Sequence, residues 1–330
     1  MPDSTAIIAC PVCGTAVTGP PLRRWTAEQA AAHFCPRSRD AGRHARLQRT
    51  VTRLWGGDEG LVFVCPECGF GFAWPHVGGD EEYYGILHEQ AGYPANRWEY
   101  DWTIANVLSR FPTGGTILDI GAGSGVFLRR LAPGWRRLAT EGSPATREIL
   151  DRAGIGCFTD IAAALAAARG SCAVVTMFQV LEHIAGFRSL LAECHALLQP
   201  GGMIVISVPL APDLFVQEDL TGCPDMTPNH VNKWSPESLS RALRVAGFAP
   251  QPAVVARRRL KNLTSRVELI TRSQAARNPA SLAARAYAIG NRRLRLGALA
   301  AVSALNLVGT VPHWPRLLAG KDFVMVGRKD

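Results

Sequence analysis

The sequence predicts an α/β fold in which a mostly parallel sheet carries a ligand site along one edge. Apolar strand patterns alternate with helical patterns through the middle of the chain, as expected of parallel strands joined by crossover helices. The first of these strands runs directly into a glycine-rich segment. Two matched pairs of cysteines precede this region, and a strongly basic segment lies near its end. These observations predict one large domain with a small module before it and an insertion late in the chain.

The glycine-rich segment follows a predicted strand over residues 117–120. Asp119 lies near the strand's end, and Gly121, Gly123 and Gly125 follow at alternate positions. Glycine is needed where the backbone turns sharply and comes close to a ligand, although the spacing alone is also typical of an ordinary tight turn. We expect a helix to follow, with its free N–H groups directed at the ligand. The acid disfavours a pyrophosphate and favours a cationic, hydroxyl-rich ligand.

Further elements follow in a fixed order. Residues 137–141 read as a second strand that ends in Glu141, twenty residues after Gly121, where a carboxylate would hold a ribose diol. A buried strand over residues 172–178 leads into Glu182 and His183. The last elements are a helix over 187–198, a Pro-Gly-Gly turn, a strand over 203–208, and a helix after His230 that ends near residue 247.

In this order the motifs resemble those of the class I S-adenosylmethionine-dependent methyltransferases: LDIGAGSG, the acid after the next strand, LEH, LQPGG and a final GF. The resemblance covers residues 98–258 and the last few residues, and it implies a Rossmann-like methyltransferase sheet whose last strand is antiparallel. The cofactor-binding residues that it implies are Asp119, Gly121, Gly123, Gly125, Glu141, Asp160 and Phe178. Glu141 would hold the ribose hydroxyls, Asp160 would accept from the adenine amine, and Phe178 would line the pocket. A dehydrogenase is disfavoured by the glycine spacing.

The N-terminal cysteines form two C-P-x-C-G knuckles, with Cys10 and Cys13 in one and Cys65 and Cys68 in the other. Paired, they would supply the four thiolates of a structural zinc site. The 51 intervening residues, partly helical, contain His33, Cys35 and His44 as competing ligands. Reduced structural thiols and a redox dithiol are the alternatives.

His230 is the candidate general base, because an imidazole titrates near neutral pH. Asn229-His230 and the following Ser-Pro-Glu-Ser-Leu resemble a segment of sugar C-methyltransferases that also carry an N-terminal zinc module. Those enzymes commonly have Glu before the histidine, so Asn229 favours hydroxyl over carbon methylation. His230 could equally fix the loop by hydrogen bonding. Glu182-His183 resembles part of a metal-binding segment of ubiquinone-pathway O-methyltransferases, but Gln179 replaces its first acid, and we favour a role in capping the next helix.

The net charge of +9 is concentrated near the C-terminus. Residues 257–321 contain thirteen Arg or Lys and one acid, a balance of +12, so the remainder of the chain sums to −3. Arg292, Arg293 and Arg295 precede the apolar stretch 296–311, which would allow peripheral contact with an anionic membrane. There Leu299, Val302, Leu305 and Leu307 would face the lipid. A solvated basic surface is the alternative.

The expected organisation is a zinc-binding module with a helical insertion over 1–75, an aromatic connector over 76–102, a methyltransferase core over 103–258 and 322–330, and a basic helical insertion over 259–321. No signal peptide or membrane span is recognised, which predicts a cytoplasmic protein, peripheral to the membrane at most. The expected activity is methyl transfer from S-adenosylmethionine to a hydroxyl, or a carbon, of a sugar or glycan-like or natural-product small molecule. A lipid-linked or membrane-bound acceptor is the first alternative. A nucleic-acid acceptor is disfavoured because few aromatic residues interleave the basic segment.

Overall fold

The structure is a computed structural model that describes residues 8–37, 39–89, 97–222, 224–278 and 280–330, without the side chains of residues 88, 276 and 277. Part of the expected connector, residues 90–96, and Cys223 lie outside the described residues. The chain divides into two compact units. The first comprises Met1–Pro209, Met226–Val254 and Phe323–Asp330, and the second comprises Leu210–Asp225 and Val255–Asp322.

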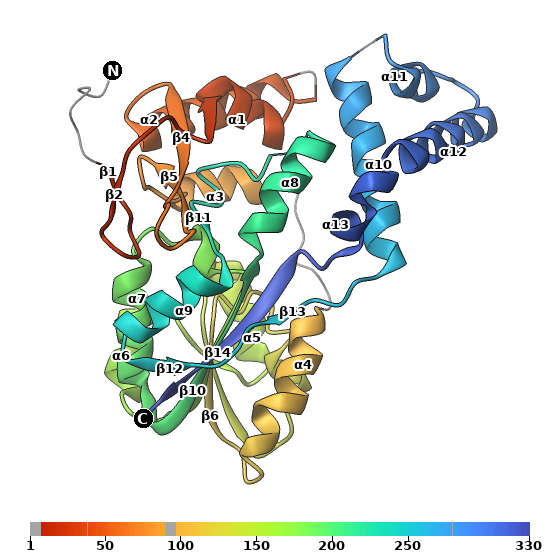
Figure 1. Cartoon of the computed structure of the whole chain (residues 1–330). Helices are drawn as coiled ribbons and strands as arrows, with labels where there is room; N and C mark the ends of the chain where they lie inside the picture. Colours follow the sequence, from red (N-terminus) through yellow and green to blue (C-terminus); the bar gives the residue numbers. More distant parts are fainter. Residues whose placement is uncertain (1–7, 38, 90–96, 223, 279) are drawn as a thin grey trace. The chain divides into compact units, whose positions relative to one another are not determined.

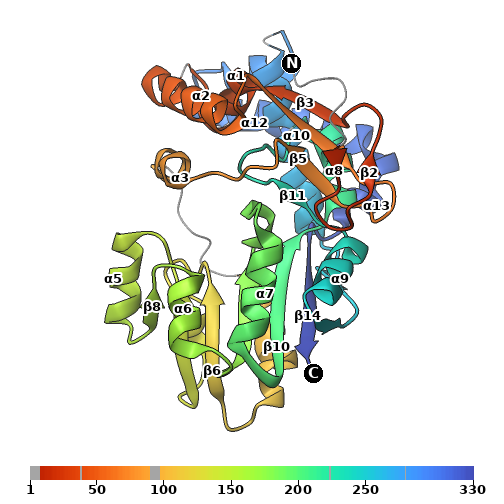
Figure 2. The ribbon, with the colours of Figure 1, turned by 90° about the vertical axis from the view of Figure 1, so that its left-hand side faces the viewer.

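The main sheet of the first unit has strands in the order β12-β14-β10-β9-β6-β7-β8, with β13 paired to β14 (Figure 1). Their bounds are β6 (Gly115–Ile120), β7 (Trp135–Thr140), β8 (Gly156–Phe158), β9 (Cys172–Phe178), β10 (Leu198–Pro209), β12 (Phe248–Pro250), β13 (Val254–Val255) and β14 (Asp322–Lys329). The strands β10, β9, β6, β7 and β8 pair in parallel, whereas β14 points the other way (Figure 2). This confirms the predicted Rossmann-like fold, whose parallel strands bring their carboxyl ends to one edge.

Helices cover both faces of this sheet, which explains why β9 is buried along its whole length. In Figure 1, α6, α7 and α9 lie on one face and α4 and α5 on the other. The bounds are α4 (Trp98–Asn106), α5 (Pro144–Arg152), α6 (Ile161–Ala168), α7 (Phe187–Leu197), α9 (Pro236–Val245) and the single turns η1 (Leu108–Arg110), η2 (Leu128–Arg130) and η3 (Leu181–His183). The core between them includes Val107, Ile117, Leu150 and Val174, each 1% exposed or less.

The helix expected directly after the glycine-rich segment is absent from the structure. Residues 121–127 form turns, and only the 3-10 turn η2 follows before β7 begins. The prediction of a helix N-terminus over the glycines was therefore wrong. A ligand at this loop would therefore meet the backbone N–H groups of the turns at residues 121–127, and not those of a helix N-terminus.

The N-terminal residues build a second, four-stranded sheet in the order β11-β5-β4-β3. The bounds here are β1 (Ile8–Ala9), β2 (Ala16–Val17), β3 (Arg23–Thr26), α1 (Ala27–Phe34), α2 (Ala41–Trp55), β4 (Glu59–Val64), β5 (Gly71–Trp74), α3 (Glu81–His88) and β11 (Asn232–Lys233). The strand β11 comes from the segment after His230, so the core contributes one strand to the N-terminal sheet. Phe70 packs against Phe187 and Trp234, with ring centroids 5.7 and 4.6 Å away. The cysteine module is thus packed into the first unit.

The second unit is helical and is more extensive than the predicted insertion. It contains α8 (Ala211–Thr221), α10 (Leu260–Arg277), α11 (Leu282–Tyr287), α12 (Arg292–Gly309), η4 (Val311–His313) and α13 (Trp314–Leu318). Its small core centres on Leu263, Val267 and Leu317, against which Leu220 of α8 packs. Within the described residues no single helix has the length and apolarity to cross a membrane, and only α12 taken together with Val311–Leu318, across a 64° bend, meets that test.

Candidate functional site

The glycine-rich loop leaves β6 in a conformation that only glycine adopts easily. Gly121, Gly123 and Gly125 have φ angles of +68°, +52° and +72°. A Cβ on Gly121 would lie 2.8 Å from Val180 Cγ2, and one on Gly125 would lie 2.6 Å from Leu150 Cδ2. The backbone therefore packs tightly on one side, and the segment after β9 lies against the loop.

Asp119 is buried at the end of β6, with 3% of its surface exposed. It is in register with Thr176 on β9, whose Oγ1 donates to Asp119 Oδ1 at 2.6 Å. Burial raises the pKa of Asp119 to about 7, against the opposing effect of the Thr176 hydrogen bond. A cationic group brought beside this carboxyl would favour its ionised form, so the position suits an ammonium.

Glu141 follows β7 directly and its carboxylate spans two loops. Its Oε2 accepts from the backbone N–H of Gly123 at 3.0 Å, and its Oε1 accepts from the N–H of Ser143 at 3.0 Å. A guanidinium nitrogen of Arg147 donates to the Glu141 carbonyl at 3.0 Å. The carboxylate thus ties the tip of β7 to the glycine-rich loop, and it remains only half-buried.

Asp160 and Phe178 lie at the ends of two other strands of the sheet. Asp160, two residues after β8, caps α6 by accepting from the N–H of Ala163 at 2.8 Å, and this bond lowers its pKa. Phe178, the last residue of β9, meets the rings of Phe127 and Tyr100 at centroid distances of 4.8 and 5.0 Å. In the structure Asp160 therefore acts as the N-cap of α6. Phe178 forms an aromatic wall together with Phe127 and Tyr100.

A polar cluster that the sequence did not predict lies beside this wall. Ser207 on β10 is in register with Phe178, and Ser207 Oγ donates to Oε1 of the buried Glu99 at 3.3 Å. Gln179 Nε2 lies 3.4 Å from both Glu99 Oε1 and Ser207 Oγ. Gln179 has a φ of +59°, the only non-glycine residue with positive φ in the described segments. The backbone turn at Gln179 directs the chain from β9 toward η3 and His183.

His230 lies in a cluster built from three distant segments. Its ring centroid is 4.6 Å from that of His183, and Glu182, His183 and His230 each present a ligand atom within 4.8 Å of the others. His183 Nδ1 lies 2.7 Å from the carbonyl of Asn229 and 3.2 Å from the hydroxyl of Tyr84 on α3. Because a carbonyl only accepts, His183 Nδ1 carries the proton, which leaves Nε2 as the basic nitrogen.

The carboxylate of this cluster is buried, whereas its two histidines are half-buried. Glu182 is 1% exposed, and burial together with the Glu182 charge raises the pKa of Tyr84. A Cβ on Gly78 would lie 2.5 Å from the carbonyl oxygen of His183, so the segment after β5 rests on η3. Next to it, His76 Nε2 lies 2.7 Å from Asn232 Oδ1. The arrangement can hold a proton on an imidazole beside a carboxylate, and it has the ligand types of a divalent-cation site.

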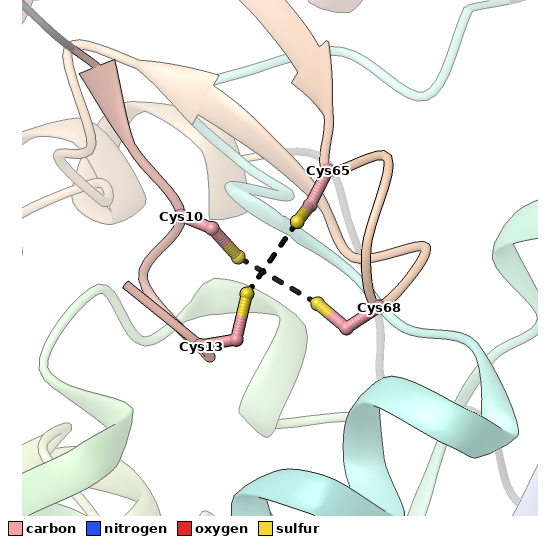
Figure 3. A group of neighbouring side chains, drawn as sticks. All are labelled: Cys10, Cys13, Cys65 and Cys68. Atoms are coloured by element: carbon pink, nitrogen blue, oxygen red, sulfur yellow. Dashed lines mark hydrogen bonds between the residues drawn. The ribbon is translucent and has the colours of Figure 1, made fainter. Parts of the chain in front are cut away.

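The four N-terminal cysteines converge on one point (Figure 3). Cys10 Sγ lies 3.7 Å from Cys68 Sγ, Cys13 Sγ lies 3.5 Å from Cys65 Sγ, and all four sulfurs fall within 4.8 Å of one another. Burial raises the pKa of Cys10 to about 11. Outside this group, His44 is occupied by the Cys35 carbonyl at 2.9 Å and by Glu28 Oε2 at 3.0 Å. The expected competitors Cys35 and His44 are therefore not part of the cluster.

Comparison with known proteins finds a family match over the central part of the chain. Residues 97–252 match the family described as a methyltransferase domain. The matched residues include the glycine-rich loop, Glu141 and His230, so this part of the chain is a methyltransferase domain. A comparison of the methyltransferase with curated proteins gave no significant match.

Solved structures similar to this methyltransferase share low sequence identity with it. An S-adenosylmethionine-dependent methyltransferase from Archaeoglobus fulgidus is 16% identical, with 75% of this chain and 100% of that chain covered and a TM-score of 0.45. The YcgJ protein of Bacillus subtilis is 13% identical, with 66% and 92% covered and a TM-score of 0.42. A phosphoethanolamine N-methyltransferase of Haemonchus contortus is 15% identical, with 69% and 52% covered and a TM-score of 0.40. At these sequence identities and TM-scores, the similar structures give no information about the acceptor.

Several residues around the site of the methyltransferase escaped sequence reasoning. Tyr84, Glu99 and Ser207 come from an N-terminal helix, the first helix of the core and a central strand. Ser207, near the end of an apolar strand, was one detectable signal, because a buried hydroxyl requires a partner. Gly78 and Gly79 in the connector were a second signal of close approach that we did not use.

Proposed function

We propose that the methyltransferase transfers a methyl group to a hydroxyl of a sugar or glycan-like small molecule, and that His230 accepts the proton. The observation that carries the proposal is the close grouping of His230, His183, Glu182 and Tyr84. Glu182 and His183 follow β9 by only a few residues, and Val180 between them and the strand packs against Gly121 of the glycine-rich loop. A hydroxyl held there would be near the loop proposed to hold the methyl donor.

The cofactor-binding roles proposed here follow the geometry of the loop. Gly121, Gly123 and Gly125 would admit the amino-acid end of S-adenosylmethionine, and buried Asp119 would face its ammonium. Glu141 would exchange its contacts with loop N–H groups for the ribose hydroxyls, since a carboxylate accepts two O–H bonds. Phe178 would line the pocket, and Asp160 would reach the adenine amine only by leaving its helix cap. The sulfonium supplies the methyl group, and the protein orients the reactants and excludes water.

The proton would pass from the acceptor hydroxyl to a ring nitrogen of His230. His183, held through Nδ1 by the Asn229 carbonyl, positions the loop that carries His230. Glu182 adds a negative charge that stabilises an imidazolium once the proton has moved. Carbon methylation would need a stronger base system than this pair, and Asn229 supplies no further carboxylate.

The Cys10, Cys13, Cys65 and Cys68 group is proposed to hold a structural zinc ion. Four sulfurs placed about 2.3 Å from zinc form a tetrahedron with edges of about 3.8 Å, close to the two shortest sulfur separations. Gly14 and Gly69 close the knuckles with φ angles of +76° and +67°. Residues 71–72 then pair with residues 232–233, shortly after His230. The ion would therefore support the His230 loop without taking part in the chemistry.

The test of His230 is a comparison of His230→Asn with wild type and with His195→Asn as a matched control. His195 lies in the last turn of α7, against Phe248. We expect His230→Asn to lower kcat by about a hundredfold or more, to leave affinity for S-adenosylhomocysteine unchanged, and to abolish the acid limb of the pH–rate profile. Unchanged kcat would remove His230 from the mechanism. Activity that is lost to a chelator and restored by Mg²⁺ would instead assign the cluster to a cation.

A further inference from the structure

The helix α12 in the second unit directs several polar side chains toward α10 and exposes several large apolar ones. Toward α10, Asn306 Nδ2 donates to Thr271 Oγ1 at 2.9 Å and pairs with the Gln274 side chain at 3.0 Å in both directions. One turn away, Ser303 Oγ lies 3.3 Å from Thr271 Oγ1. The seam between the two helices is thus held largely by side-chain hydrogen bonds, and Leu307 adds a contact to the small core.

The opposite face of α12 is apolar and exposed. Leu294, Leu305 and Val308 are 66%, 62% and 71% exposed, and their spacing, with Ala301 between them, places them on one stripe of a helix. No residue of α12 is buried. Of the four residues that the sequence suggested for this face, Leu305 is exposed, whereas Leu299, Val302 and Leu307 are half-buried, and Leu307 packs against the small core. The predicted orientation was therefore wrong for Leu307, and for Leu299 and Val302 it stays a prediction.

Such an arrangement is unfavourable for a helix whose outer face meets water. Leucine gains free energy by leaving water, whereas polar seams between helices are typical of helices that lie in or against lipid. Exposed large apolar residues are also concentrated here: nine of the twelve in the described chain belong to the second unit. Such a concentration of exposed large apolar side chains is typical of an interaction surface.

The charge around the stripe indicates which surface it meets. Arg292, Arg293 and Arg295 occupy the first turn of α12, and no charged residue follows before Arg316. The segment 257–321 contains a single acid, Glu268, whose Oε1 lies 3.3 Å from Arg272. Basic residues at one end of an apolar helix face suit a bilayer with anionic headgroups.

We propose that α12 binds an anionic phospholipid surface, with Leu294, Leu305 and Val308 in the acyl boundary and the first-turn arginines at the headgroups. The helix lies along the membrane surface. This assignment is independent of which acceptor the enzyme methylates. It gives the basic insertion a function that the methyltransferase fold does not require.

The experiment is co-sedimentation of the full-length protein with vesicles of phosphatidylcholine alone or of equal phosphatidylcholine and phosphatidylglycerol, at low and moderate salt. We expect binding to the anionic vesicles only, weakening steeply with salt. Arg292→Gln/Arg293→Gln/Arg295→Gln should lower the partition coefficient on the order of a hundredfold, at about fivefold per arginine. The matched control Arg129→Gln/Arg136→Gln/Arg244→Gln removes three exposed arginines of the first unit and should bind as wild type.

A second variant separates insertion from simple charge attraction. Leu294→Gln/Leu305→Gln/Val308→Gln should lose binding while keeping the wild-type circular dichroism, because these side chains are exposed. Its control is Leu22→Gln/Ile149→Gln/Val245→Gln, which changes three exposed apolar residues of the first unit. Equal binding to neutral and anionic vesicles, or undiminished binding by the α12 variant, would overturn the proposal. So would a wild-type dimer that the α12 variant converts to a monomer, since the stripe would then be an interface between copies.

Discussion

Single residues at the ends of strands carry most of the cofactor assignment. Glu141 already accepts hydrogen bonds from Gly123 and Ser143, so its carboxylate is held at the loop before any ligand arrives. Asp119 is buried and bonded to Thr176. Both positions were predictable from sequence because a strand, its terminal acid and the following glycines are neighbours along the chain. The contacts of Glu99 and Tyr84 could not be predicted from the sequence, because their partners lie 80 to 108 residues away along the chain.

Replacing Glu141 tests the cofactor site directly. We expect Glu141→Ala to weaken S-adenosylhomocysteine binding by about tenfold or more, since a hydrogen bond to a charged acceptor is worth on the order of 1.5–3 kcal/mol. Isothermal titration calorimetry provides the measurement. Glu148→Ala is the control, because Glu148 is an exposed acid on α5 that pairs with Arg152. Equal affinities for the wild type and Glu141→Ala would exclude Glu141 from the site.

The raised pKa of Asp119 predicts a pH dependence of stability. Burial raises this pKa to about 7, whereas the unfolded carboxyl has a pKa of about 3.9, so the native state binds the proton more tightly. The stabilisation is therefore complete below about pH 4 and is lost as the pH rises through about 7. Asp119→Asn should remove this pH dependence of the free energy of unfolding. As the pH rises from about 4 to about 7, the variant should become more stable than wild type by on the order of a few kcal/mol. Urea unfolding measured across that range checks it, and parallel pH profiles for the two proteins would contradict the assignment.

At the scale of elements, the strands β6, β7, β9 and β10 and the helices α7 and α9 were predictable, and the absence of a helix after the glycine-rich loop was not. Buried apolar runs such as β9 identify themselves by composition and length. After Gly125, however, only seven residues precede Pro133-Gly134, which end any helix before β7 begins. The pattern of a strand followed by spaced glycines led us to expect a helix that the local sequence is too short to form.

The packing of the loop against the segment after β9 yields a prediction at this scale. Gly121→Ala would place a Cβ 2.8 Å from Val180 Cγ2 at a φ of +68°, so the loop must shift. We expect a lower melting temperature and weaker S-adenosylhomocysteine binding. Gly186→Ala is the matched control, because a Cβ there meets nothing within 4 Å and its φ is −79°. Thermal melts in the presence and absence of ligand make the comparison, and equal effects of the two variants would count against the close approach.

At the scale of the whole molecule, the cysteine module and the methyltransferase sheet share one compact unit. From the sequence we expected a zinc-binding module over 1–75 that is separate from the core over 103–258. The structure links them more closely: β11 pairs with β5, and Arg188 on α7 donates to the carbonyls of Pro11 and Val12 at 2.6 and 3.1 Å. Sequence could not reveal this, because the pairing joins segments more than 150 residues apart.

Removing a cysteine ligand should therefore affect the His230 loop as well as the cysteine module. Wild type should contain about one zinc per chain, and Cys65→Ser should lose it. Since β11 lies two residues after His230, we expect turnover to fall more steeply than affinity for S-adenosylhomocysteine. Cys157→Ser, a free thiol on β8, is the control. Elemental analysis measures the zinc content, and binding and rate measurements on the same samples test the effect on turnover. A wild-type protein that is fully active without metal would rule out the zinc site.

The central claim is that this chain moves a methyl group from S-adenosylmethionine to a hydroxylated small molecule. The most direct measurement is mass spectrometry of hydroxylated sugars and cell-extract metabolites incubated with the enzyme and methyl-deuterated S-adenosylmethionine. The account predicts S-adenosylhomocysteine and a product that carries the labelled methyl on oxygen, both absent with Glu141→Ala/His230→Asn. Tight binding of NAD with no affinity for S-adenosylhomocysteine, and no labelled product, would contradict it.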